Sequence, residues 1–324
     1  MSNMIIDTHA HLWPDNYLDR LEELGSPDIS IAKQMNASDS LDDLKHRFNN
    51  MKSAGVDRQI LSATPQSPQW GSPQESLESA MFINNSYYEL IKKYPNHFHA
   101  YGAVPLPNVE EAISEGKRAI KELGFLGIGV NTLIQNKIPI TDEQFYPFFE
   151  AMDKLNTVIY IHPTGCGALT PLVNDYDLEW VVGAPIEDML VTLQLLKSNI
   201  PQKFPNIKFH IAHLGGGISF QMQRIMDNYS DWDAFSENPL NILKSNFWFD
   251  TANFLEGALM NSAEVLGSNR LLMGSDFPYF MDDKYTRAVD YIYNSRLNSE
   301  EKENILSKNA LNLYQKSASF DTEA

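Results

Sequence analysis

The most restrictive feature of this chain is a series of short apolar segments that alternate with segments of helical periodicity. The apolar segments, rich in β-branched and aromatic residues, are expected to form strands at residues 4–9, 56–63, 99–104, 126–131, 157–162, 207–213, 247–251 and 270–275. Apolar residues recur at the spacing of amphipathic helices at residues 41–54, 75–94, 109–123, 142–155, 186–200, 218–229, 258–266, 285–295 and 299–315. Because the strand segments are apolar almost throughout, both faces of their sheet should be covered.

Eight strand–helix units in 324 residues predict an α/β fold of the (β/α)8 or TIM-barrel type. A doubly wound open sheet is the competing fold, disfavoured because no GxGxxG motif follows the first strand. Residues 14–37 lack strong periodicity and are expected to be a short insertion that covers the barrel mouth. Ser40 and Thr141 are expected helix N-caps. We expect the barrel domain to span residues 1–316, closing helices included, with a loose tail at 317–324.

Composition and charge exclude several classes of protein. The formal net charge is 25 − 42 = −17, and nucleic-acid binding normally requires a basic face. A single cysteine excludes an internal disulfide framework and a multi-cysteine metal site. The start of the chain lacks the basic flank and long apolar run of a signal peptide, and no apolar stretch approaches the ~20 residues that span a bilayer. We therefore expect a cytoplasmic protein with no membrane partner.

Reactive side chains gather at the ends of four predicted strands, where the chemistry of such barrels takes place. His9 and His11 end the first strand and share a face, His162 ends the fifth, His213 ends the sixth and Asp276 follows the eighth. A lone histidine there is usually only a hydrogen-bonded polar residue, but this coincidence predicts a metal site. Imidazoles with a carboxylate suit zinc, with manganese or iron as alternatives.

The remaining histidines are expected to have no role at this site. His46 lies on a predicted helix, and His97 and His99 flank the start of the third strand, the wrong end for catalysis. His210 is expected to point toward the helix layer, opposite to His213. Asp7 shares the predicted inward face with the two histidines of the first strand and is expected to orient them by hydrogen bonding.

The order and spacing of several motifs carry a family resemblance. They include DTHAH at the first strand, YPNHFHAYGAVPL, KELGFLGIGVNT, the IHP triplet, EWVVGAP, KFPNIKFHIAHLGGG and GSDFP. With these motifs the chain resembles the amidohydrolase superfamily. Within it, the chain is similar to the metal-dependent, non-oxidative decarboxylases of the 2-amino-3-carboxymuconate-6-semialdehyde decarboxylase type.

The resemblance implies a role for each matching residue. One divalent metal ion, completed by a water or hydroxide, would be bound by His9, His11, His162 and Asp276. His213 would be the catalytic acid/base beside that water. Arg47 would grip a substrate carboxylate, Arg224 would be delivered from a neighbouring subunit of a homodimer, and Trp180 would line the pocket.

The reaction expected from this resemblance is decarboxylation of a conjugated or aromatic carboxylic acid. Binuclear members of the superfamily carry a bridging lysine at the fourth strand, and FLGIGVNT contains none, so one metal is expected. His9-x-His11 favours the muconate-semialdehyde branch over hydroxybenzoate decarboxylases, which usually begin with Glu-x-His. The loop at 164–167 departs from that branch, which leaves hydroxylated aromatic acids open as substrates.

Two other functions fit parts of the same pattern. The first is a hydrolase of a lactone, amide or imide, in which Asp276 would shuttle the proton. Arg47 distinguishes the decarboxylase from the hydrolase, because a neutral substrate has no carboxylate for it to bind. The second is a non-catalytic binding protein, which would have no use for His213 beside an open metal position.

Overall fold

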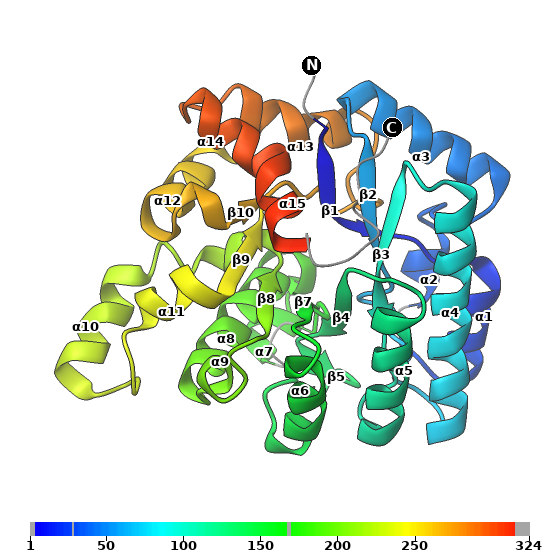
Figure 1. Ribbon diagram of the computed structural model, residues 1–324, viewed down its shortest axis with the longest axis horizontal. Coiled ribbons are helices and arrows are strands. Elements are labelled where there is room, and N and C mark those ends of the chain that lie inside the picture. Colours follow the sequence, from blue (N-terminus) through cyan, green and yellow to red (C-terminus); the bar gives the residue numbers. More distant parts are fainter. Residues whose placement is uncertain (1–3, 28, 167–169, 315–324) are drawn as a thin grey trace.

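A parallel sheet curls into a nearly closed barrel at the centre of the molecule (Figure 1). The computed structural model describes residues 4–27, 29–166 and 170–314. Within these residues the barrel strands, in order, are β1 (Ile6–His11), β2 (Arg58–Ser62), β3 (Phe98–Ala103), β4 (Gly127–Asn131), β7 (Val158–His162), β8 (Lys208–Ile211), β9 (Phe247–Asp250) and β10 (Leu271–Leu272). The predicted TIM barrel is confirmed, and each predicted strand is present.

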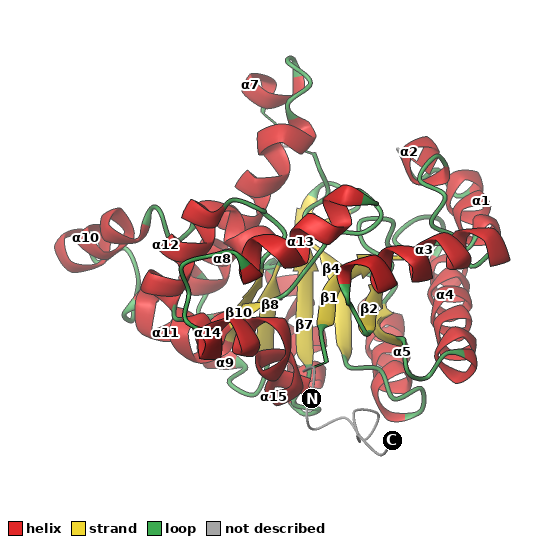
Figure 2. Cartoon of the chain, turned by 90° about the horizontal axis from the view of Figure 1, so that it is seen from above, coloured by secondary structure: helices red, strands yellow, loops and turns green. Residues whose placement is uncertain are grey.

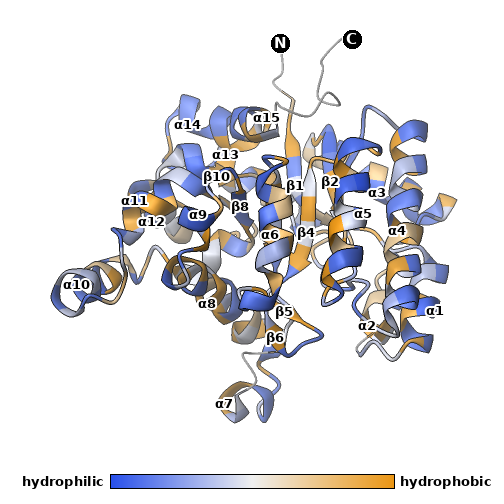
Figure 3. Ribbon diagram, turned by 60° about the horizontal axis from the view of Figure 1, so that its bottom comes forward, coloured by the Kyte–Doolittle hydropathy of each residue, from blue (hydrophilic) through white to orange (hydrophobic). Residues whose placement is uncertain are grey.

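Helices surround the barrel (Figure 2), and hydrophobic residues gather on the strands and on the helix faces turned toward them (Figure 3). This is the pattern that a sheet buried on both faces requires. The helices of the outer layer that follow the barrel strands are α3 (Leu41–Ala54), α4 (Pro73–Lys93), α5 (Val109–Lys121), α6 (Tyr146–Asp153), α8 (Ala184–Lys197), α10 (Met222–Trp232), α11 (Pro239–Asn246), α12 (Glu256–Leu266) and α13 (Asp283–Tyr293).

Further elements fill the connections and close the chain. The helical ones are α1 (Asp15–Glu23), α2 (Ile29–Lys33), η1 (Glu143–Phe145), α7 (Pro171–Asn174), η3 (Glu179–Gly183), α9 (Ile200–Lys203), η4 (His213–Gly217), η5 (Ser268–Arg270), α14 (Ser299–Glu303), η6 (Asn304–Lys308) and α15 (Asn309–Tyr314). A small hairpin pairs β5 (Leu133–Ile134) with β6 (Ile138–Pro139). None of the helices in the described ranges is long and apolar enough to cross a membrane.

The helix caps follow the sequence at one predicted position and not at the other. Ser40 accepts a hydrogen bond from the Asp43 N–H and caps α3, as predicted. Thr141 was expected to cap the sixth helix, but Asp142 takes that place and accepts from the Gln144 N–H. The helical segment begins with the 3-10 helix η1 directly after Asp142. The first N–H group that needs a cap therefore lies one residue further along the chain than predicted.

The barrel closes between β1 and the segment that follows β10. The Thr8 N–H donates to the Met273 carbonyl at 2.9 Å, and the Asp276 N–H donates to the His9 carbonyl at 2.9 Å. A further bond, at 2.7 Å, joins the His11 N–H to the Phe277 carbonyl. These hydrogen bonds place the end of the first strand beside Asp276, although 265 residues separate His11 and Asp276 in the chain.

The predicted insertion, residues 14–37, forms α1 and α2. Ile31 and Met35 from this segment line the cavity above the strand ends, so the insertion covers the mouth as expected. The predicted tail at 317–324 lies outside the described residues.

Candidate metal centre and substrate cavity

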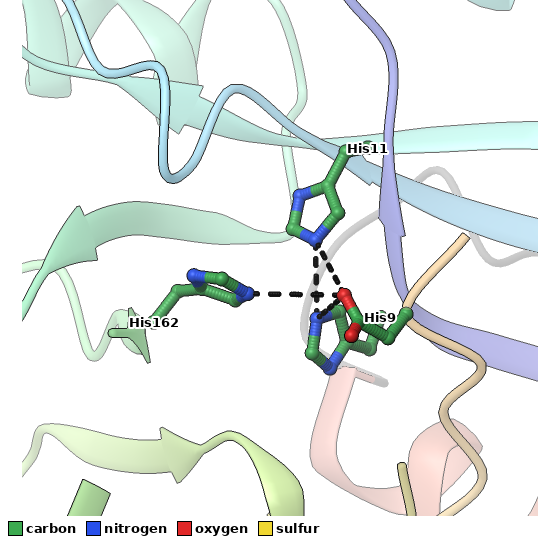
Figure 4. Close-up of side chains that lie close together, drawn as sticks. His9, His11 and His162 are labelled. Carbon is green, nitrogen blue, oxygen red and sulfur yellow. Dashed lines mark hydrogen bonds and ion pairs between the residues drawn. The ribbon is translucent and has the colours of Figure 1, made fainter. Parts of the chain in front are cut away.

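Four predicted ligands converge at the C-terminal ends of the strands (Figure 4). One ligand atom from each of His9, His11, His162 and Asp276 lies within 4.8 Å of all the others, and the four residues are buried. His9 Nε2 lies 3.1 Å from His11 Nε2 and 3.2 Å from Asp276 Oδ1. Ligands bound ~2 Å from one zinc ion lie roughly 3 Å apart, so these separations suit a single ion.

The chemistry of these side chains also fits a cation. His162 Nε2 is buried without a hydrogen-bond partner among the described residues, which is costly unless a ligand fills the gap. Burial lowers the pKa of His11 to about 4 and holds that of His162 well below its usual value. Both imidazoles are therefore neutral at pH 7, the form that binds a metal. The predicted metal site is confirmed, and β4, which ends at Asn131, contains no lysine.

Asp250, at the end of β9, orients this site and was missed by the sequence analysis. Its Oδ2 lies 3.0 Å from His9 Nδ1, and its Oδ1 accepts from the His213 N–H. Burial opposes ionisation of Asp250, but the His9 and His210 imidazoles outweigh it and hold the carboxyl pKa well below its usual range. A carboxylate on the far nitrogen of a ligand imidazole fixes its tautomer. The signal was present in the sequence, since this aspartate ends the seventh strand.

Asp250→Asn is expected to weaken metal binding by about 10- to 100-fold while the fold persists. The neutral amide keeps the volume of Asp250 but not the charge that holds His9 with Nε2 free for the metal. Competition with a zinc chelator measures the change. Asp282→Asn is the matched control, because the Asp282 side chain is 72% exposed and contacts His46 and Asn50, which are not metal ligands. Equal affinity in the Asp250 and Asp282 variants would contradict the role.

Asp7 holds the backbone of His9 and not its ring, contrary to the expectation that it orients the imidazoles: its Oδ1 accepts from the His9 N–H at 3.2 Å. Its carboxylate also accepts hydrogen bonds from Gln59 Nε2, Ser275 Oγ and the Tyr285 hydroxyl. An irregularity in the β1–β2 register between Asp7 and Ala10 breaks the simple alternation of faces on which the expectation rested. Asp7 thus ties β1 to the segment after β10.

His213 lies beside the metal ligands, and a carboxylate on the other side of its ring holds it in place. Its Nδ1 is 2.9 Å from Asp188 Oδ2, and its Nε2 is 3.5 Å from Asp276 Oδ2. Burial alone would lower the pKa of His213, but the Asp188 carboxylate overrides it and holds the pKa well above the usual value. Nε2 is therefore a proton donor aimed at the cavity. Asp188 lies on α8, and sequence analysis did not find it because no strand-end rule applies to a helix.

The turn that carries His213 depends on its glycines. From His213 to Gly216 the backbone is left-handed, with φ between 52° and 64°. A Cβ on Gly216 would come within 1.7 Å of the Pro185 carbonyl oxygen. Only glycine allows this turn to approach α8 closely enough for His213 to reach Asp188.

His210 points into the barrel, not toward the helices as expected. Its Nε2 lies 3.3 Å from Asp250 Oδ2, and its Nδ1 lies 3.1 Å from the Tyr101 hydroxyl. β8 ends at Ile211 and the chain turns sharply at His213. Strand alternation therefore does not extend to His213, and both histidines face inward at different depths.

A cavity of about 480 Å³ opens above the metal ligands. Trp180 is among its lining residues, as predicted, and its ring centroid lies 5.8 Å from that of Tyr279. A Cβ on Gly165 would come within 2.7 Å of this indole, so the small loop residue makes room for it. The lining residues are Ile31, Met35, His162, Pro163, Trp180, Val181, Ala184, Pro185, His213, Ala252, Asn253, Phe254, Asp276, Tyr279, Phe280 and Arg287.

Arg47 is not brought to this cavity. It is 1% exposed, and it donates to the His11 carbonyl at 2.6 Å and to Gln59 Oε1 at 2.9 Å. Its guanidinium lies 4.3 Å from the centroid of the Phe277 ring. In this position Arg47 supports the backbone of the first metal-binding strand and lies outside the cavity in which it was expected to grip a carboxylate. The sequence pattern located the helix but not the direction of its side chain.

Arg47→Ala is expected to lower the free energy of unfolding by about 2–4 kcal/mol, since it leaves buried acceptors unsatisfied and opens a gap against Phe277. Denaturant unfolding measures the loss. Arg296→Ala is the control, because the Arg296 side chain is 72% exposed and its removal should cost little. A normal unfolding midpoint combined with a raised KM would contradict the structural role.

Arg224 lies on the exposed face of α10, the helix at the far left of Figures 1 and 2. It does not line the cavity of its own chain. Its delivery to a neighbouring subunit stays a prediction.

Comparison with known proteins places the chain among enzymes of similar architecture. It is 28% identical to 2-amino-3-carboxymuconate-6-semialdehyde decarboxylase of Dictyostelium discoideum, over 94% of this chain and 90% of the relative. It is 28% identical to γ-resorcylate decarboxylase of a Polaromonas strain, over 85% of this chain and 88% of the relative. A crystal structure of a Polaromonas dihydroxybenzoic acid decarboxylase, with bound manganese and 2-nitroresorcinol, has a TM-score of 0.82 and 24% identity, covering 97% of each chain.

A family model described as amidohydrolase matches residues 6–316. The match contains every barrel strand, the four metal ligands and His213. The chain therefore belongs to the amidohydrolase family.

Proposed function

We propose that this protein is a metal-dependent, non-oxidative decarboxylase of a conjugated or aromatic carboxylic acid. The observation that carries the proposal is that two of the metal ligands, His162 and Asp276, line the same cavity as His213, whose ring is held by Asp188. The similarity to two named decarboxylases, each over more than four-fifths of this chain, supports the same reaction.

Decarboxylation needs a place for the electron pair left on carbon when carbon dioxide departs. A divalent cation, when bound, supplies Lewis-acid stabilisation of developing negative charge on a substrate oxygen. His213 is placed to deliver the proton from Nε2 that replaces the lost carboxylate. Asp188 holds the ring by Nδ1 and stabilises its protonated form. Asp276 has one oxygen, Oδ1, among the metal ligands and the other 3.5 Å from His213 Nε2.

The cavity walls suit a flat, unsaturated substrate. Trp180, Tyr279 and Phe280 contribute aromatic surface on which a conjugated system can stack. The His9-x-His11 motif favours the muconate-semialdehyde type, and the γ-resorcylate relative extends the proposal to hydroxylated aromatic acids. Both substrate classes share a carboxylate attached to a conjugated system.

We propose zinc as the cofactor, because three imidazoles and one carboxylate match its preferences. The manganese bound to the Polaromonas enzyme makes that ion the first alternative. Metal analysis of protein purified without added metal distinguishes the two.

We propose a homodimer in which Arg224 reaches the partner's cavity. Phe220 and Trp232, near the two ends of α10, are 81% and 79% exposed, and large exposed apolar side chains mark protein interfaces. Mixing inactive Arg224→Ala and His213→Asn variants tests this arrangement. Recovered activity supports delivery between subunits, and a monomeric protein contradicts it.

A carbon dioxide release screen tests the proposed reaction. Purified protein loaded with zinc is offered muconate semialdehydes and hydroxybenzoates, with lactones, amides and imides in parallel. Carbon dioxide from an acid supports the proposal. Hydrolysis of the neutral substrates without decarboxylation identifies a hydrolase instead.

A further inference from the structure

One arginine faces the metal cavity, and it is not the one that the sequence pattern singled out. Arg287 lies on α13 and lines the same cavity as His162, His213 and Asp276. It is the one lysine or arginine among the described residues that line this cavity. In a chain with a net charge of −17, a local cation of this kind reverses the sign of the field that an anionic substrate meets.

Two aromatic rings support the Arg287 guanidinium. Its carbon lies 5.0 Å from the centroid of Phe254 and 6.0 Å from that of Phe280. The two rings meet edge to face at 4.8 Å. A guanidinium packed in this way keeps its in-plane N–H groups free for a planar anion.

The loop that carries Phe254 is held in an uncommon conformation. Phe254 has a φ of 66°, a left-handed value that costs about 1 kcal/mol or more outside glycine. The Tyr291 hydroxyl donates to the Thr251 carbonyl at 2.5 Å and fixes the start of the loop. The surrounding contacts thus maintain a strained backbone that presents the ring to Arg287.

Arg287 has no carboxylate partner among the described residues. In residues 4–27, 29–166 and 170–314, no Asp or Glu oxygen lies within 4.0 Å of its guanidinium. Arg118 and Arg296, by contrast, each pair with a glutamate, and Arg47 is buried away from the cavity.

We infer that Arg287 is a specificity-determining residue that binds the carboxylate of the substrate at the cavity wall. This inference rests on the proposed decarboxylase function, and it transfers to Arg287 the role that the family resemblance implied for Arg47. The ligand is a carboxylate on a flat conjugated system, with its ring against the aromatic wall and its anionic end against α13.

Equilibrium binding tests this role in a His213→Asn background, in which the acid is not turned over and wild type means that Arg287 is unchanged. The probes are 2,6-dihydroxybenzoate and resorcinol, which share the ring and hydroxyls and differ only in the carboxylate. Zinc-loaded wild type is expected to bind the acid more tightly than resorcinol. Arg287→Gln should weaken acid binding by about tenfold or more, as for loss of a charge-assisted hydrogen bond, and change resorcinol binding less than twofold. Arg287→Lys, which keeps the charge, should recover part of the loss.

Arg270→Gln is the matched control. Arg270 also stacks on an aromatic ring, 4.4 Å from the centroid of Trp248, but it ends η5, directly before β10, at the opposite end of the barrel. Unchanged acid binding in Arg287→Gln, equal loss for both probes, or no wild-type preference for the acid would each overturn the inference. Since no carbon dioxide is measured, a selective loss of acid binding supports the subsite even if the decarboxylase proposal fails.

Discussion

Replacing His213 with asparagine is expected to leave about one divalent ion per chain and to lower kcat by roughly 100- to 10,000-fold, the usual contribution of a positioned acid or base. The amide of asparagine cannot deliver a proton at neutral pH. The ligand atoms of His9, His11, His162 and Asp276 converge without the ring of His213, so the metal should remain. Steady-state kinetics and metal analysis on the same preparation separate the two effects.

Two further variants test whether the loss of kcat is specific to the His213 site. Asp188→Asn removes the carboxylate that holds His213 by Nδ1, so kcat should fall while the metal content and fold persist. His97→Asn changes an exposed histidine at the other end of the barrel and should leave kcat unchanged. Full turnover in the His213 variant would show that another group supplies the proton.

Removing the metal is expected to abolish detectable turnover and to destabilise the protein. Without a cation, three imidazoles and a carboxylate face one another in a buried space, and nothing stabilises charge on a substrate oxygen. Reconstitution with one equivalent of zinc or manganese should restore activity. Metal at 1,000 times its Kd adds about 4 kcal/mol to the free energy of unfolding.

Thermal unfolding followed during a metal titration gives a readout independent of turnover. The midpoint should rise until about one ion per chain is bound and then level off. Asp276→Asn should flatten this titration, since it removes the only carboxylate among the four described ligands. A metal-free preparation with full activity, or saturation at two ions, would contradict a one-metal site.

The sequence predicted those parts of the site that follow from strand order. His9, His11, His162, His213 and Asp276 end or follow barrel strands, and the strand ends of a closed parallel barrel meet at one mouth. Asp250 obeys the same rule and could have been found. The common cause is that backbone topology alone brings strand ends together.

Residues on helices could not be placed in this way. The direction of a helical side chain depends on how the helix rotates and packs, which short-range periodicity does not determine. Arg47 was therefore expected in the cavity and lies buried behind β1. Asp188 and Arg287, which do reach the site, carried no signal. His210 and Asp7 failed for another reason, since a bulge and a sharp turn break strand alternation near the mouth.

Carbon dioxide release from a carboxyl-labelled acid is the most direct test of the central proposal. Metal-free and zinc-reconstituted protein are given the same conjugated or hydroxylated aromatic acid, and labelled carbon dioxide and the decarboxylated product are both quantified. The proposal predicts equal amounts of the two from the reconstituted protein and none from the metal-free protein. Equal release with and without metal, or hydrolysis of a lactone or amide with no release from any acid, would contradict it.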